Sequence, residues 1–357
     1  MWIRQGLLSV GVLVVLASCA SNTTVRELPA LAVKKSQLTL PGSSPFHLVA
    51  TVVSPKDLSD HVHTARIEEY WVSPEKWRRT VTAPEFSQLL IVNGAKVHEE
   101  LTGDYYPNWL RTLVNAIFDP GSPLQGVDLT KSDDNPVRNV PLFCRRFATP
   151  VGIAPVSNDV FSTYCFKGGL LEGVNIPGYV AGYDNYAPFS DKQVARTVRG
   201  YIDRDHRPEA HITELRILNA PDESLFVIAE PRAPLQTVFV NEQQARAQAV
   251  EAPPMVWPKV EEGQLSGVAS TYVSIDRGGN VRETHALNND HPDIGEAARA
   301  QLMRWRFRPF VAQGAPVQAE TILTFAYSTQ LQSSGSLMPR YELERLFGGV
   351  FKPRQGS

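Results

Sequence analysis

Residues 64–101, which decide the fold of the first half of the chain, read TARIEEYWVSPEKWRRTVTAPEFSQLLIVNGAKVHEEL. The first run, Thr64–Val72, alternates between apolar and polar side chains, which is the period of a strand that buries one face. Its apolar face carries Ala65, Ile67 and Trp71. Ser73-Pro74-Glu75-Lys76 then turns the chain into a further run, Trp77–Thr82. The stretch therefore predicts consecutive strands that pair antiparallel.

The end of the same stretch carries a hairpin signal. Asn93-Gly94 lies between two strand-like runs, Ser87–Val92 and Ala95–Leu101. This dipeptide favours a type I′ turn, because both of its residues tolerate the positive φ that the turn requires.

Strand-like runs continue on both sides, and a single helical pattern interrupts them. Phe46–Val53 precedes the stretch, and Trp109–Phe118 follows it with apolar side chains at helical spacing. Later runs lie at 142–147, 160–167, 170–175, 196–203 and 210–218. Many consecutive strands with one helix predict an antiparallel α+β domain, at 41–232, and not a βαβ fold.

The second half predicts a smaller domain. Residues 233–251 are polar and Ala-rich, which is typical of a linker. Residues 252–330 follow the order β-β-α-β, with a turn at Arg277-Gly278-Gly279-Asn280 and a helix that starts at His291-Pro292. Residues 331–357 form a Ser- and Gly-containing tail.

The N-terminus predicts export. Arg4 precedes an apolar run, Gly6–Leu16, which is 11 residues long, whereas a transmembrane helix needs about 20. This pattern fits a signal peptide over residues 1–18. Leu16-Ala17-Ser18-Cys19 resembles the lipobox of bacterial lipoproteins, in which the cysteine thiol is acylated and becomes the new N-terminus. An ordinary signal peptide that happens to contain a cysteine is the alternative.

The lipobox resemblance implies a location. In that family the cysteine carries three acyl chains, such as palmitate, and several chains anchor a protein stably. Ala20-Ser21, with no Asp after Cys19, resembles an outer-membrane address. We therefore expect a cell-envelope protein that is anchored to the outer membrane, faces the periplasm and has residues 19–40 as its tether.

The two remaining cysteines suit an oxidising compartment. Cys144 and Cys165 lie in strand-like runs that a loop separates. Neighbouring antiparallel strands bring such residues within reach of a disulfide. A catalytic or metal-binding thiol pair is the alternative, although no Cys-x-x-Cys motif supports it.

The small domain has the most specific family motifs. Residues 274–281 (SIDRGGNV), 304–309 (RWRFRP) and 314–317 (GAPV) occur in this order, with Ala297-Ala298 between the first two. The set resembles the C-terminal domain of TonB-family energy transducers. The resemblance implies a final strand at a sheet edge, where the peptide of an outer-membrane receptor adds as a further strand. It places that contact at Arg306, Arg308, Leu323, Phe325 and Tyr327.

The chain departs from a transducer at its N-terminus. Transducers span the inner membrane by a helix that contacts a proton-driven motor, and here the lipid on Cys19 takes the place of that helix. A lipid cannot transmit force, so the sequence predicts a tethered binding protein that takes part in transport.

The large domain resembles, more loosely, the LolA/LolB-type carriers of outer-membrane lipoproteins. Glu69-Tyr70-Trp71, Ser73–Arg78, Asn93-Gly94 and Trp109-Leu110 follow the order of that family. The resemblance implies a half-open barrel with a lid helix over an apolar cavity for acyl chains. The candidate ligand-binding residues are Trp71, Trp77, Phe86, Trp109, Leu113 and Ile117. Core packing is the alternative for each of them.

Other function classes have little support. The net charge of −2 provides no basic field for nucleic acid. His61-x-His63 is half of a metal site without a third ligand, and no catalytic or phosphate-binding motif is present. We therefore expect no cofactor, no metal and no enzymatic activity. A lipid or lipoprotein carrier and a purely structural envelope protein remain the alternatives to a partner-binding protein.

Overall fold

The structure is a computed structural model, which describes residues 24–56, 62–125, 127–134, 142–148, 161–201, 207–232, 234, 236–258, 266–287 and 291–328. Cys19, the signal peptide and the tail 331–357 lie outside these residues. None of the described helices combines the length and apolar character needed to cross a membrane.

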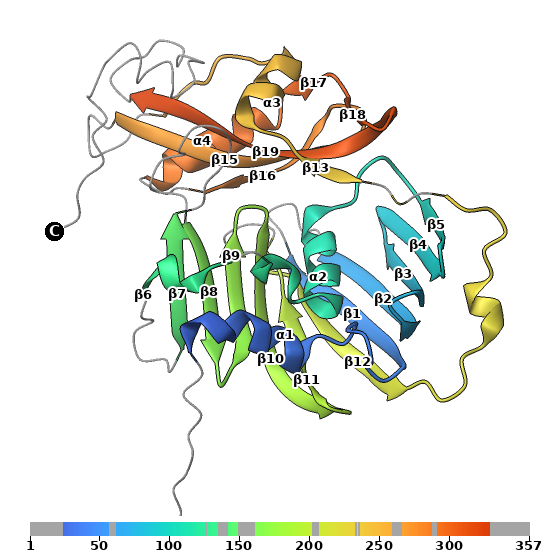
Figure 1. Cartoon of the computed structure of the whole chain (residues 1–357). Helices are drawn as coiled ribbons and strands as arrows, with labels where there is room; N and C mark the ends of the chain where they lie inside the picture. The colour runs from blue at the N-terminus through green and yellow to red at the C-terminus, as the bar shows by residue number, and fades with distance from the viewer. Residues whose placement is uncertain are drawn as a thin grey trace, which may run out of the picture.

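The first domain is one large antiparallel sheet, as predicted. Its strands are β1 (Phe46–Lys56), β2 (Val62–Ser73), β3 (Lys76–Ala83), β4 (Phe86–Asn93), β5 (Lys96–Leu101), β6 (Asp133–Asp134), β7 (Phe143–Ala148), β8 (Phe161–Lys167), β9 (Leu170–Ile176), β10 (Tyr179–Phe189), β11 (Lys192–Arg199) and β12 (Glu209–Ile217). The described strands follow the order β5-β4-β3-β2-β1-β12-β11-β10-β9-β8-β7-β6. The sheet curves but does not close between β5 and β6 (Figure 1).

The hairpin at Asn93-Gly94 forms with a different turn from the one predicted. Asn93 pairs with Lys96 at the end of β4 and β5, so the loop residues are Gly94 and Ala95. Gly94 has a φ of 61°, whereas Asn93 and Ala95 are absent from the positive-φ residues. One positive φ at the first loop position is the pattern of a type II′ turn. The type I′ prediction is therefore wrong, because Asn93 extends the strand.

Helix α2 (Asn108–Phe118) holds the sheet together, as the helical pattern predicted. Its apolar side chains pack against β10 and β11 on the inner face of the sheet (Figure 1). Leu110 and Leu113 are fully buried, and Trp109, Val114 and Phe118 are nearly so. This helix therefore fills the concave side of the sheet, where it lies between the sheet and the second domain.

The segment predicted as a tether is partly folded. Residues 25–27 form the short helix η1 (Val25–Glu27), and α1 (Leu28–Ser36) follows it. Helix α1 packs on β9 and β11, with Ala32 buried and Lys192 donating from its Nζ to the carbonyl of Lys34. The tether prediction is wrong for residues 28–36, because the apolar run at 28–33 packs on the sheet through Leu28, Ala32 and Val33.

Short 3-10 helices complete the first domain. They are η2 (Ser122–Leu124), η3 (Leu129–Lys131) and η4 (Glu223–Phe226).

The disulfide prediction is confirmed. Cys144 in β7 and Cys165 in β8 are directly opposed in the strand ladder and are bonded to each other. The cross-link closes a separation of 21 residues near the end of the large sheet.

Removing this disulfide should destabilise the first domain. The double variant Cys144→Ser/Cys165→Ser should lose about 3 kcal/mol of unfolding free energy, because the unfolded chain regains the entropy of an open loop of this length. Urea unfolding of the mature chain measures the loss. Wild-type protein in dithiothreitol should match the variant, and two reactive thiols in untreated wild type would contradict the disulfide.

The second domain has the predicted β-β-α-β order and additional elements. Its elements are β13 (Thr237–Phe239), α3 (Glu242–Gln248), β14 (Ala249–Glu251), β15 (Ser266–Ile275), β16 (Val281–Ala286), α4 (Pro292–Leu302), β17 (Arg306–Phe307), β18 (Phe310–Ala312) and β19 (Ala315–Ser328). The main sheet follows the order β13-β19-β15-β16, and β18 pairs with β19. Trp305 and Phe307 lie in the core with Leu302 of α4 and Phe325 of β19.

The predicted linker is wrong for residues 237–251. Strand β13 pairs in parallel with β19, and β14 pairs with β17 (Figure 1). Between them, α3 begins at Asn241, whose side chain accepts from the backbone of Gln244. Ala245 is fully buried in the core of the domain. Linkers and surface helices can both have a polar, Ala-rich sequence. Packing against β19 decides that this segment forms a helix.

Candidate functional site

The N-terminal end of α2 connects the two domains through a half-buried carboxylate. The Asn108 backbone N–H donates to Oε1 of Glu283 at 2.6 Å, and the Tyr105 hydroxyl donates to the same oxygen at 2.5 Å. Glu283 lies on β16, on the face of the second sheet opposite α4. One carboxylate of the small domain thus anchors the start of the helix that fills the large domain.

The surroundings of Glu283 favour its charged form. Burial opposes the charge, but His285, Tyr105 and the Asn108 backbone N–H together lower the pKa of Glu283 below its ordinary value. The nearest His285 nitrogen lies 3.5 Å from the carboxylate. Burial also raises the pKa of Tyr105 well above its usual range, so the hydroxyl stays a donor. Because the pKa of Glu283 is lowered in the folded state, the stability that its charged carboxylate contributes is lost as pH falls through that pKa.

Further polar contacts extend the interface. Arg111 of α2 forms an ion pair with Glu320 of β19. Gln318 exchanges two hydrogen bonds with the backbone of Tyr106, at 2.9 and 3.1 Å. Gly178 lies so close to the Tyr272 ring that a Cβ there would be 2.5 Å from Cε2. The two domains therefore meet across a specific, hydrogen-bonded surface.

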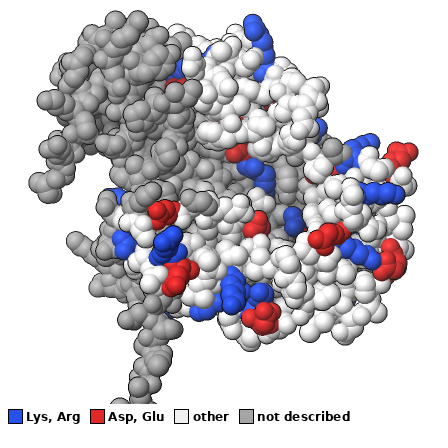
Figure 2. All heavy atoms as spheres, viewed as in Figure 1, with Lys and Arg blue, Asp and Glu red and all other residues white. Residues whose placement is uncertain are grey.

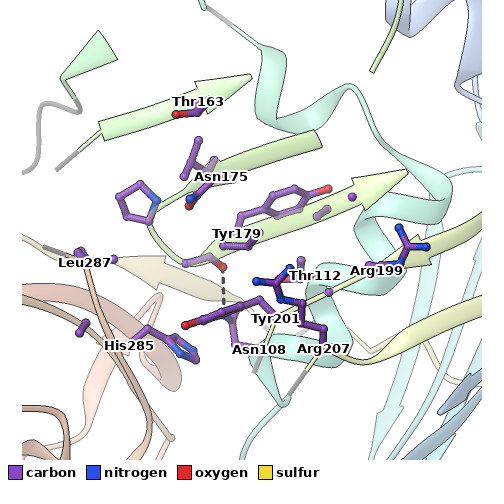
Figure 3. Close-up of a pocket in the computed structure, with 18 of the residues that line it drawn as sticks. Asn108, Thr112, Thr163, Asn175, Tyr179, Arg199, Tyr201, Arg207, His285 and Leu287 are labelled. Carbon is purple, nitrogen blue, oxygen red and sulfur yellow. Dashed lines mark hydrogen bonds between the residues drawn. The ribbon is translucent and has the colours of Figure 1, made fainter. Parts of the chain in front are cut away.

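A crevice of about 690 Å³ opens beside this interface. One wall is the β9–β10 hairpin with Asn175 and Tyr179, and the other is the end of β16 with His285 and Leu287 (Figure 3). Asn108 crosses its floor and donates from Nδ2 to the carbonyl of Gly178 at 3.0 Å. Both domains line this space, so it exists only in the assembled chain.

The described lining of the crevice is basic. It includes Arg146, Arg199 and Arg207, and no aspartate or glutamate. Asp184 and Glu209 outside the lining form ion pairs with Arg199 and reduce its contribution. On the face that Figure 2 shows, by contrast, acidic and basic side chains are interspersed without a large patch of one sign. The crevice is therefore suited to a negatively charged ligand.

Aromatic rings lie within the same space. Tyr201 packs edge-on against His285, with ring centroids 5.7 Å apart. His285 also stacks on Tyr272, with a centroid separation of 5.6 Å. The rings of Tyr201 and His285 line the crevice and give it flat, partly apolar surfaces, which suit a peptide or another ligand with apolar parts.

The candidate partner-binding residues lie elsewhere. Leu323, Phe325 and Tyr327 point into the core of the second domain and are at most 6% exposed. Arg308 is exposed, and Arg306 is partly buried, with Nη1 donating to the carbonyl of Trp305. Of the five, only the two arginines present side chains to solvent, and neither lines the crevice.

The edge of β19 is also covered, so the prediction of an open final strand is wrong for residues 318–324. Strand β13 pairs with residues 318–320. Beyond it, the Thr324 N–H donates to Glu242 at 3.0 Å, and Arg246 donates to the Thr324 carbonyl at 2.8 Å. The segment that was expected to be a linker occupies the backbone groups that a partner strand would need.

The six candidate ligand-binding residues belong to one hydrophobic core. Trp71, Phe86, Trp109, Leu113 and Ile117 are at most 4% exposed, and Trp77 packs against them. Ile117 also borders a cavity of about 10 Å³, which is about the space of one water molecule and far too small for an acyl chain. Core packing accounts for all six, and their binding of lipid stays a prediction.

The predicted half metal site gains no further ligand in the described residues. His61 lies outside them, and the His63 ring packs edge-on against Trp109 at 5.4 Å. The described residues contain no group of three or more side chains arranged to hold a metal ion.

Comparison with known proteins supports the assignment of the second domain. Residues 256–329 match the family model of the Gram-negative bacterial TonB protein C-terminal domain. The TonB resemblance of this segment is therefore confirmed. No curated protein matches the chain significantly.

Solved structures of other proteins are similar to part of this chain. A LolA superfamily protein of Nitrosomonas europaea has a TM-score of 0.35 and 8% identity, covering 58% of this chain and 98% of its own. A putative outer membrane lipoprotein-sorting protein domain of Vibrio parahaemolyticus has a TM-score of 0.30 and 12% identity, covering 51% and 89%. A DUF1329 family protein of Desulfovibrio piger has a TM-score of 0.34 and 8% identity, covering 57% and 97%. The fold assignment itself rests on the strand order described above.

Proposed function

We propose that this chain is a lipid-anchored binding protein of the Gram-negative envelope, whose TonB-like domain binds a protein partner in transport and catalyses no reaction. The observation that carries the proposal is the family match over residues 256–329, on a domain that is fixed to a second domain and shares a crevice with it. Hydrogen bonds from Tyr105 and Asn108 to Glu283 hold the two domains together, which supports the crevice as a preformed site.

The N-terminus supports a tethered protein over an energised transducer. A signal peptide over residues 1–18, followed by Cys19, supplies a lipid anchor in place of a membrane-spanning helix. An acyl anchor holds a protein at a membrane surface but gives no rigid connection to a motor in the other membrane. The chain therefore serves to hold a binding surface at the membrane, with the outer membrane as its expected location.

The carrier alternative has weaker support from the geometry. A lipoprotein carrier needs a preformed apolar cavity. The side chains expected to line one are instead packed together beneath α2. A partner-binding role needs only the surface that the two domains share.

Site-specific photocrosslinking in a Gram-negative host tests the proposal. A photoreactive phenylalanine analogue at Tyr201, which lines the crevice, or at exposed Arg308 should give discrete adducts with an envelope protein. The same analogue at Ile217, which is 49% exposed on β12 of the first domain and lies outside the crevice, is the matched control. Adducts of one mass at Tyr201 or Arg308 but not at Ile217 support the proposal. Their absence from both positions would favour a structural role.

The lipid anchor has a separate test. Cys19→Ala should move the protein from the membrane fraction to the soluble periplasmic fraction, because the thiol that accepts the acyl chains is lost. Intact-mass measurement of the wild-type mature protein should show a chain that begins at Cys19 and carries acyl groups. A variant that still sediments with membranes, together with an unmodified wild-type mass, would refute the anchor.

A further inference from the structure

Strand β16 ends the second sheet with open backbone groups. Among the described strands it pairs only with β15, and it is last in the order β13-β19-β15-β16. The Leu287 N–H donates to the Ser270 carbonyl at 2.9 Å. In this register, His285 also bonds to β15, because bonded residues occur at every second position. Because the bonded residues alternate, Thr284 and Ala286 direct their N–H and C=O groups away from β15. An extended segment can pair with such an edge.

The same end of β16 forms a wall of the crevice. His285, Ala286 and Leu287 line it, with the β9–β10 hairpin on the opposite side (Figure 3). A strand added to β16 there would lie between the two domains. The opposite edge of the sheet differs, because β13, Glu242 and Arg246 already bond to β19.

The charge of the crevice selects the kind of segment. Arg146 and Arg207 are exposed within the lining, whereas Arg199 already forms ion pairs with Asp184 and Glu209. Without an acidic side chain in the described lining, Arg146 and Arg207 attract carboxylates and repel basic chains. Asn175 and Thr163, which line the crevice from the large domain, add side chains that form hydrogen bonds.

We propose that the crevice binds an acidic, extended segment of a partner protein, which adds as a strand to the open edge of β16 at Thr284 and Ala286. This inference rests on the proposed function and specifies its site. Backbone hydrogen bonds to β16 hold the segment, and carboxylates at alternate positions contact the arginines of the large domain. The partner therefore contacts both domains at once.

Binding of a defined peptide tests the charge and the strand pairing. The probe is a fluorescein-labelled octapeptide of alternating valine and aspartate, measured by fluorescence polarisation against the full mature chain with Cys19→Ala. Its lysine counterpart should not bind. N-methylation of alternate backbone nitrogens, which removes donors needed for strand pairing, should weaken binding by about tenfold or more.

Variants locate the site. Arg146→Glu/Arg207→Glu should weaken binding of the aspartate peptide by about 100-fold, because two attractive contacts become repulsive. Ala286→Pro should weaken it by about tenfold, since proline removes the outward N–H yet is tolerated on an edge strand. Arg66→Glu/Arg216→Glu makes the same charge change at exposed positions outside the crevice and should leave binding unchanged.

The possible outcomes separate the inference from the proposed function. Equal binding by Arg146→Glu/Arg207→Glu and wild type, or loss only in Arg66→Glu/Arg216→Glu, overturns the crevice as the site. Undiminished binding of the N-methylated peptide overturns strand pairing, whether or not Ala286→Pro folds. If photocrosslinks form while these variants bind normally, the site is wrong and the proposed function stands. If no envelope protein crosslinks, the proposed function fails as well.

Discussion

Replacement of Gly279 by alanine should destabilise the second domain by about 4 kcal/mol or more, which places it among the most damaging single substitutions. Gly279 has a φ of 88°, which L-residues rarely adopt. A Cβ at this position would lie 1.9 Å from the carbonyl oxygen of Phe307 and 2.9 Å from its carbonyl carbon. The Phe307 N–H also donates to the Gly279 carbonyl at 2.8 Å, so the two backbones cannot separate without losing that bond. Because Phe307 lies in the core, any movement that relieves the clash disturbs the packing of the whole domain.

Gly314→Ala is the matched control for this substitution. Gly314 has a φ of 82°, and nothing lies within 4 Å of a Cβ built there. Gly314→Ala should lower the unfolding free energy by only about 1–2 kcal/mol, which is the cost of backbone strain. Urea unfolding of the full mature chain, followed by tryptophan fluorescence, compares the two variants. Equal losses would show that φ strain alone, without the contact to Phe307, explains the effect of Gly279→Ala.

Arg79→Ala should destabilise the first domain by about 3–5 kcal/mol, because it leaves a buried carboxylate without its partner. Glu69 is fully buried, and Arg79 donates from Nε to its Oε2 at 2.5 Å. The guanidinium also stacks on Phe118 and Trp77, with its carbon 4.2 and 5.0 Å from the ring centroids. Substitution therefore removes the ion pair and a contact between the sheet and α2 together.

Two further measurements separate these contributions. Burial raises the pKa of Glu69 above its ordinary value although Arg79 opposes the shift. Without Arg79 the folded-state pKa rises further, so folding takes up a proton and the loss should shrink as pH falls. Glu69→Leu/Arg79→Met should recover most of the loss, because no charge stays buried. A pH-independent loss, or a double variant as unstable as Arg79→Ala, would contradict the role of the buried charge.

Local patterns in the sequence predicted most of the elements. Alternation at Thr64–Val72 and the helical stripe at Trp109–Phe118 gave β2 and α2, because each period fixes which side chains share a face. The cysteines were paired correctly, since both lie in neighbouring strands. The signal Asn93-Gly94 predicted the hairpin but not its turn type, because one residue of strand extension moves the loop by one position. Polar composition was a weaker guide and hid α3, and the short apolar run of α1 was too brief to be separated from its polar surroundings.

The candidate site shows what local patterns leave open. Glu69 shares the strand period of Ile67 and Trp71, so its place on the buried face follows from the sequence, but its partner Arg79 depends on how β2 and β3 pair. The crevice was not predicted, because Asn108, Arg207 and His285 are far apart in the sequence and belong to no common motif.

The sequence by itself determined the antiparallel large domain, the TonB-like small domain and the disulfide partners, since each depends on local spacing or composition, and the export signal with Cys19 stays a prediction. Only the tertiary structure decided that residues 237–246 cover the edge of β19 and that β16 is left open beside a basic crevice. The physical reason is that an edge strand is closed by whichever segment pairs with it, and that pairing depends on contacts between residues distant in the chain.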